Sequence, residues 1–283
     1  MTNSVSSQNV FVRITFVAVL SVCAWSTAAN AVQLDIDQLP RLASHEATYD
    51  LSLIRAAQIE GVRAVSGAMR YALFDQCDGY TIETDVEMSF TFSNGLSNRV
   101  VKRYAGWESK DGRRSTFRMH VYENGESEDA YTGEVTLEAD GSGRATYIST
   151  DSITFDLPPG TVLSTRQTRE MLAAGQSGSS LIAHTVMDGS FEDGPYRTSG
   201  FVAPARALAP EASQLPKITL LEGPYWPVSL AYFPLGKEEE TPEYELNLHI
   251  LGNGVTRAMT QDYGDYTLAV QLTGIKPREG GCP

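Results

Sequence analysis

The sequence predicts an all-β protein that is exported from the cytoplasm. Apolar and polar residues alternate with a period of two in many segments, which is typical of strands with one buried face. Asp-Gly and Asn-Gly pairs separate several of these segments and favour hairpin turns. An apolar segment of 12 residues, 14–25, precedes them. It is shorter than the roughly 20 apolar residues that a membrane-spanning helix needs.

The first 31 residues have the organisation of a cleavable signal peptide. Arg13 is their single charged residue, and Ala29-Asn30-Ala31 has the small-x-small form that signal peptidase accepts. We therefore expect cleavage near Ala31 and one mature domain over 32–283. Lipid attachment at Cys23 is disfavoured because Val22 is bulkier than the small residue expected at that place. The length of the apolar segment disfavours an uncleaved anchor.

The clearest predicted strand covers 80–90, where the even positions are apolar or Thr and the odd positions are polar, mainly acidic. Long strands with one wet face must cover the other face on a second layer, as in an antiparallel sandwich or barrel. The other predicted strands lie at 47–53, 69–73, 117–121, 131–137, 244–250 and 266–272. The turn pairs are Asn94-Gly95, Asp111-Gly112, Asn124-Gly125, Asp140-Gly141, Asp188-Gly189, Asn253-Gly254 and Tyr263-Gly264.

One helix is predicted at about 164–175. Ser164 is the expected N-cap, good helix formers follow it, and Gly175 is the expected end. The sequence Pro158-Pro159-Gly160 interrupts the strand pattern just before this helix. We therefore expect a first half over about 39–160 and a second half over about 180–283. The composition of 203–214 predicts a loop.

The chain is acidic, with a net charge of −13 at pH 7. Nucleic-acid binding requires clustered Lys and Arg, so this balance argues against such partners. It also argues against charge-driven attachment to an anionic membrane surface.

The sequence predicts no metal site, no cofactor and no enzyme. None of the four histidines, His45, His120, His184 and His249, has a second His or Cys at a metal-ligand spacing. The acidic stretch 188–194 lacks the spacing of a calcium loop and predicts a hairpin turn with exposed acids. A hydrolase with a dispersed triad stays an alternative, because triads are defined by geometry.

Aromatic residues are the candidate contacts with a ligand or a partner. They flank irregular or proline-bounded segments, where a groove or a barrel mouth could form. The favoured alternative is that they fill the core of a curved sheet. These residues are Trp107, Tyr225, Trp226, Tyr232 and Phe233.

Removal of the signal peptide leaves two cysteines, Cys77 and Cys282. Two thiols in an oxidising compartment predict one disulfide, and two unpaired thiols are the alternative. A catalytic redox pair is disfavoured because no Cys-x-x-Cys spacing is present.

Four segments, together with the C-terminal cysteine, resemble the family of the cell-envelope integrity protein EipB from alphaproteobacteria. The resemblance covers about 39–282 and is carried by 42–51, 77–80, 107–112 followed by Phe117, and 155–161. It implies a periplasmic β-spiral in which two antiparallel sheets curl into a broken barrel, with a helix between the halves. It also implies a Cys77–Cys282 disulfide and a role in envelope integrity under stress. The family brings no catalytic residue or cofactor.

These observations lead us to expect a non-enzymatic periplasmic protein. It would support envelope integrity by binding a periplasmic protein or an envelope component, such as a lipid or a glycan. One alternative is a carrier that holds a lipid or another apolar ligand in the barrel interior. A second alternative is a hydrolase that acts on an envelope polymer.

Replacing Cys77 tests the predicted disulfide. We expect Cys77→Ser to lower the melting temperature under non-reducing conditions, because a bridge across so long a loop contributes up to about 5 kcal/mol. Thermal melting with and without reductant measures the effect, and the two proteins should melt alike once reduced. An unchanged melting temperature in the oxidised samples would contradict a structural bridge.

Overall fold

The computed structural model describes residues 35–56, 61–178, 180–190, 194–207, 215–236 and 241–279. The predicted signal peptide, its cleavage site near Ala31, and Cys282 lie outside the described residues. The disulfide from Cys77 therefore stays a prediction. Of the predicted loop 203–214, the described part lacks a strand and contains one isolated bridge, from Arg206 to Tyr225.

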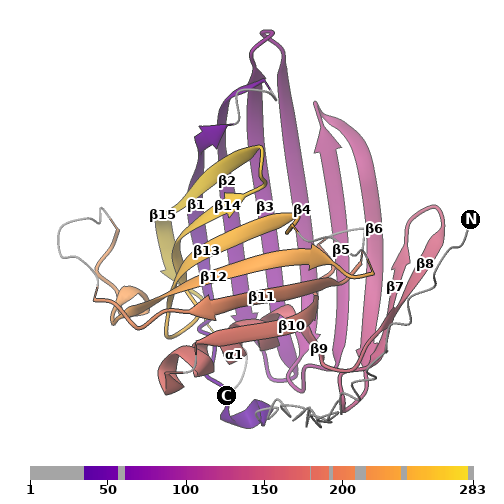
Figure 1. Cartoon of the computed structure of the whole chain (residues 1–283), viewed down its shortest axis with the longest axis vertical. Coiled ribbons are helices and arrows are strands. Elements are labelled where there is room, and N and C mark those ends of the chain that lie inside the picture. Colours follow the sequence, from indigo (N-terminus) through magenta and orange to yellow (C-terminus); the bar gives the residue numbers. More distant parts are fainter. Residues whose placement is uncertain are drawn as a thin grey trace, which may run out of the picture. The chain divides into compact units, whose positions relative to one another are not determined.

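The described residues form fifteen strands, two 3-10 helices and one α-helix (Figure 1). The first half contains η1 (Ile36–Gln38), β1 (His45–Ala56), β2 (Val62–Asp75), β3 (Gly79–Phe92), β4 (Ser97–Ser109), β5 (Arg114–Glu123), β6 (Glu126–Leu137), β7 (Gly143–Ile148) and β8 (Ser152–Leu157). The second half contains β9 (Thr161–Leu163), α1 (Ser164–Ser177), β10 (Leu181–Met187), β11 (Tyr196–Val202), η2 (Thr219–Leu221), β12 (Tyr225–Pro234), β13 (Tyr244–Leu251), β14 (Thr256–Asp262) and β15 (Tyr266–Pro277). Every predicted strand lies within one of these strands.

All the strands pair in one sheet. Its order is β8-β7-β6-β5-β4-β3-β2-β1-β15-β14-β13-β12-β11-β10-β9. Neighbouring strands are antiparallel except β9 and β10, which are parallel. Because β1 pairs with both β2 and β15, the two predicted halves are hydrogen-bonded into one continuous sheet.

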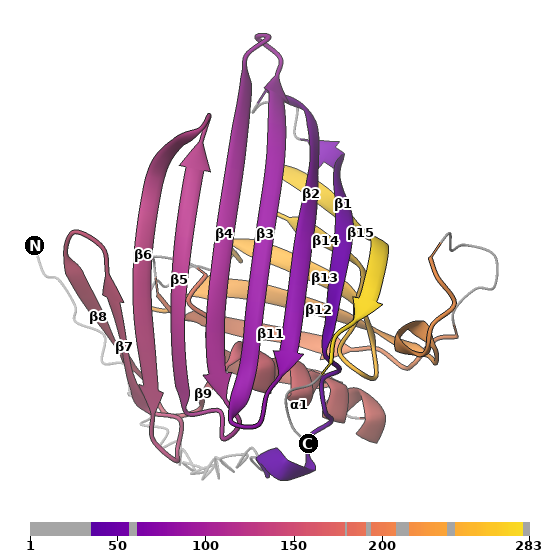
Figure 2. The same cartoon turned by 180° about the vertical axis from the view of Figure 1, so that it is seen from behind.

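The sheet curls until its two edges approach each other. The edge strands β8 and β9 are consecutive in the chain and are joined by Pro158, Pro159 and Gly160 alone. No ladder joins β8 to β9 among the described residues, so the barrel has an open seam. Figure 2 shows the long strands β2–β6 in front, with β11–β14 crossing behind them. The predicted β-rich broken barrel with one helix is confirmed.

Helix α1 is capped by a distant strand. Leu163 occupies the N-cap and supplies no side-chain hydrogen bond, so the prediction that Ser164 caps the helix was wrong. Glu108 of β4, only 1% exposed, accepts hydrogen bonds from Ser164 N at 3.2 Å, Ser164 Oγ at 2.6 Å and Thr165 N at 2.9 Å. The Thr165 hydroxyl also donates to it. Burial raises the pKa of Glu108, against the lowering by these hydrogen bonds.

The helix also continues past its predicted end. Gly175 lies inside α1, and the helix ends at Ser177 before Gly178, whose φ is 76°. A Cβ atom at Gly175 would lie 2.6 Å from Trp226 Cδ1 of β12. Gly175 therefore permits close packing of the helix on the sheet, and the helix stop belongs to the left-handed Gly178.

Replacing Glu108 tests the cap. The amide of Glu108→Gln points a donor at the donors of Ser164 or Thr165, so we expect a loss of about 1–3 kcal/mol in the free energy of unfolding. Urea denaturation followed by circular dichroism measures it. Glu134→Gln, on the exposed face of β6, is the matched control and should change stability by less than about 0.5 kcal/mol. Equal stability of the two variants would contradict the cap.

Candidate functional site

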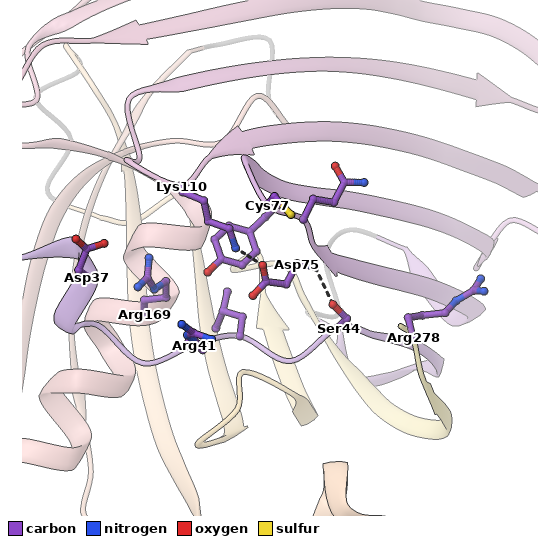
Figure 3. Close-up of a pocket in the computed structure, with 11 residues that line it drawn as sticks. Asp37, Arg41, Ser44, Asp75, Cys77, Lys110, Arg169 and Arg278 are labelled. Carbon is purple, nitrogen blue, oxygen red and sulfur yellow. Dashed lines mark hydrogen bonds and ion pairs between the residues drawn. The ribbon is translucent and has the colours of Figure 1, made fainter. Parts of the chain in front are cut away.

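A pocket of about 650 Å³ lies at the helical end of the sheet. Its walls come from segment 37–44, the turn between β2 and β3, α1, Lys110 after β4, and Arg278 after β15. Figure 3 shows these side chains. The pocket thus joins residues from both ends of the described chain with the helix between the halves.

Arg169 of α1 holds the N-terminal segment in place. Its guanidinium donates to the carbonyl oxygens of Ile36 at 2.6 Å, Leu39 at 3.1 Å and Pro40 at 2.9 Å. The residue is only 6% exposed. Among the described residues no carboxylate forms an ion pair with Arg169, so its buried charge is met by carbonyl dipoles alone.

The other cations of the pocket differ in how they are paired. Lys110 forms an ion pair with Asp75, and its ammonium lies 3.7 Å from the centre of the Tyr80 ring. The backbone N–H of Asp75 donates to Ser44 Oγ at 2.8 Å, which fixes this wall. Arg41 is exposed and has no hydrogen bond or ion pair with the described residues.

Arg278 belongs to a charge cluster around Glu46 of β1. Arg70 of β2 lies 3.2 Å from the carboxylate and Lys276 of β15 lies 2.9 Å from it, while Arg278 is also paired with it. Hydrogen bonds from Lys276 first, and then Arg70, lower the pKa of Glu46 to about 2. The cluster ties the end of β15 to β1 and keeps Arg278 at the pocket.

The pocket concentrates positive charge in an acidic chain. Four of its lining residues are cations, and the carboxylates are those of Asp37 and Asp75. Guanidinium groups bind carboxylate and phosphate with paired donors, so the arrangement can hold an anion. The described residues contain no group of three or more His, Cys, Asp or Glu that could hold a metal ion.

The predicted aromatic contacts do not lie together, and none of them lines the pocket. On β12, Trp226 packs against α1 at Gly175, and Tyr232 stacks on Tyr244 at 4.3 Å between ring centres. The other three residues have different neighbours. The Tyr225 ring lies 4.6 Å from that of His249, Phe233 lies under Arg197, and Trp107 lies near Arg114. Contact of any of the five with a ligand or partner stays a prediction.

The prediction of a turn with exposed acids was wrong for Asp188, which turns towards the interior. The Tyr104 hydroxyl donates to its carbonyl oxygen at 2.8 Å, and its carboxylate accepts from Ser190 N at 2.9 Å. Burial raises the pKa of Asp188. The turn is thus folded inward, and the spacing of acids along the sequence does not reveal this direction. Glu192 and Asp193 lie outside the described residues.

The four histidines lie on four different strands: His45 on β1, His120 on β5, His184 on β10 and His249 on β13. His184 Nε2 lies 2.7 Å from Glu170 of α1 and joins the helix to β10. His45 is buried, and its Nδ1 lies 2.7 Å from the carbonyl oxygen of Ala43.

Comparison with known proteins identifies the family. A family model described as EipB-like matches residues 36–279. This chain belongs to the EipB-like family. It is 26% identical over 252 residues to the cell envelope integrity protein EipB of Brucella abortus (strain 2308), covering 88% of this chain and 86% of that protein.

A solved structure has the same fold. It is the crystal structure of a beta-barrel-like protein of Domain of Unknown Function DUF1849 from Brucella abortus. The TM-score is 0.78 at 26% identity, over 85% of this chain and all of that one. In the described residues, no helix is both long and apolar enough to cross a membrane.

The Glu46 cluster predicts a pH dependence. The pKa of Glu46 falls from 4.5 to about 2 on folding, so its stabilisation is present above about pH 4.5 and is lost as the pH falls towards 2. Solvent screens the exposed partners, so we expect about 1 kcal/mol. Urea denaturation at several pH values should show less acid destabilisation for Glu46→Gln than for the wild type or Glu134→Gln. Parallel pH profiles for all three proteins would contradict the prediction.

Proposed function

We propose that this chain is a non-enzymatic periplasmic protein that supports cell-envelope integrity by binding an anionic envelope component. The pocket beside α1 is the binding site. Membership of the EipB-like family supports the link to the envelope. The ligand chemistry follows from the pocket itself.

One observation carries the proposal. Arg169 is almost fully buried, lies at the pocket wall, and has no carboxylate partner among the described residues. A buried charge that meets only dipoles has lost hydration without gaining a counter-ion. An anion in the pocket supplies that counter-ion.

Arg41 gives the pocket its second unpaired cation. Its side chain is exposed and is not held by a partner in the described part of the chain, so it can close on a ligand without breaking an existing ion pair. Lys110 and Arg278 already have carboxylate partners, so they attract an anion in the pocket less strongly. The volume accommodates a phosphate- or carboxylate-bearing sugar or head group.

Charge reversal at Arg41 tests the proposal. We expect Arg41→Glu to abolish protection against detergent stress in a strain that lacks the chromosomal copy, because the new carboxylate repels the anion. The melting temperature should stay within about 2 °C, since Arg41 is exposed and has no ion pair with the part of the chain that the structure describes. Arg118→Glu, on the exposed face of β5, is the matched control and should protect like the wild type.

The same variants identify the ligand. Mass spectrometry of protein purified from the periplasm should show an anionic lipid or glycan with the wild type and with Arg118→Glu, and much less of it with Arg41→Glu. Full protection by Arg41→Glu, with the same co-purified molecules, would refute binding at this pocket.

A further inference from the structure

The core of the curled sheet is divided into three clusters. One joins α1, β10–β13 and the helical ends of β2 and β3, the second lies over β5–β9, and the third lies over β1, β13 and β15. Partly buried apolar side chains border all three: Val86, Met88, Val121, Leu246, Leu248 and Met259. Tyr104 packs against the first two clusters, and Tyr71 packs against the first and the third, so the clusters are linked. The bordering side chains are nevertheless only half-buried, so part of the inner face is not covered by other side chains of the described residues.

The strand register locates the uncovered part. Cross-strand pairing places Val121 of β5, Lys102 of β4, Val86 of β3, Met69 of β2 and Tyr49 of β1 in one row on the inner face. Tyr49 is 3% exposed, whereas the three apolar residues beyond it are only half-buried. The row thus runs from the packed core to an accessible apolar surface around Lys102.

The neighbours of Lys102 are apolar side chains and one tyrosine whose hydroxyl already donates a hydrogen bond elsewhere. Along β4 it is flanked by Val100 and Tyr104, and across the sheet by Val86 and Val121. The Tyr104 hydroxyl is used by the Asp188 carbonyl. Lys102 itself makes no hydrogen bond or ion pair with any described residue.

The ammonium is accessible and yet poorly hydrated. More than a third of the Lys102 surface is exposed to solvent. The neighbouring side chains still remove part of the water around its ammonium group, and this partial burial lowers the pKa of Lys102. Asp129, which pairs with Val121 at the end of the row, is the described acid that opposes this lowering. Asp129 is exposed and forms no ion pair with Lys102.

Aromatic rings extend the apolar surface from the core towards the rim. Ring centres are separated by 4.3 Å from Tyr232 to Tyr244, 6.0 Å from Tyr244 to Tyr263, and 5.0 Å from Tyr263 to Tyr266. Phe90 of β3 follows, 6.0 Å from Tyr266. Tyr263 is 37% exposed, so the series connects buried rings with the surface.

We propose that this inner face binds a long-chain fatty acid, with its carboxylate on Lys102 and its hydrocarbon chain along the apolar wall. The site is separate from the pocket beside α1, and neither proposal depends on the other. A fatty acid matches the chemistry because it combines one negative charge with a chain that needs no hydrogen bonds. A larger polar head group would need further donors, which the four side chains around Lys102 do not provide.

Two probes with hydrocarbon chains of equal length distinguish the contribution of the charge on Lys102 to binding from the contribution of the apolar wall. Delipidated mature protein is titrated with laurate and with dodecanol by isothermal titration calorimetry. We expect Lys102→Met to weaken laurate binding about tenfold or more, because it removes a charge-assisted hydrogen bond. Dodecanol binding should be unchanged or tighter. Lys217→Met removes an exposed lysine that has no ion pair with the described residues, and it should bind both probes like the wild type.

A second variant tests the wall itself. Val121→Gln keeps Lys102 and adds a polar group beside it, so it should weaken laurate and dodecanol together. The proposal is overturned if Lys102→Met binds laurate like the wild type, or if the wild type binds neither probe. Lys102-dependent binding of phosphatidylglycerol vesicles without laurate binding would also overturn it and would assign the face to a phospholipid surface.

Discussion

The buried carboxylate of Glu108 connects the parts of this fold that have to act together. It stands on β4, in the long-stranded half, and binds the first backbone and hydroxyl donors of α1. These donors have no partner within a helix, and a negative charge there also meets the positive end of the helix dipole. Because the cap fixes α1, it also fixes Arg169, which in turn holds segment 36–40 at the pocket. One side chain thus sets the position of the helix and, through it, of the candidate site.

The sequence predicted the strands well, because their structure depends on the alternation of apolar and polar residues that are neighbours in the chain. Strands such as β1 have one packed and one wet face, and this alternation is visible in the order of residues. The Glu108 cap was not predictable in this way, since 56 residues separate it from Ser164. Gly175 was misread for a related reason, because its role depends on Trp226 of a distant strand. Composition and period do not show which distant residues will meet.

The pocket was missed for the same physical reason. Arg41, Lys110, Arg169 and Arg278 come from four parts of the chain and share no motif. The pairing of β1 with β15 brings Arg278 beside Glu46, and the helix brings Arg169 to segment 36–40. The aromatic residues that the sequence does suggest have separate surroundings: Trp226 packs on α1, Tyr232 stacks on Tyr244, and Tyr225 packs against the core cluster over β1, β13 and β15. An inward turn likewise makes Asp188 an interior group.

The join between β8 and β9 limits how far the open barrel can widen beside it. Three residues connect the two edge strands, so the edges cannot separate by more than about 14 Å at that point. Gly160 N also donates to the carbonyl oxygen of Asp140 at 2.8 Å, which pins the join to the turn between β6 and β7. Leu157 of β8, Leu163 of β9 and Met187 of β10 also belong to one core cluster, so side-chain packing crosses the seam. A short covalent join and shared packing thus keep together two edges that have no strand ladder between them in the described chain.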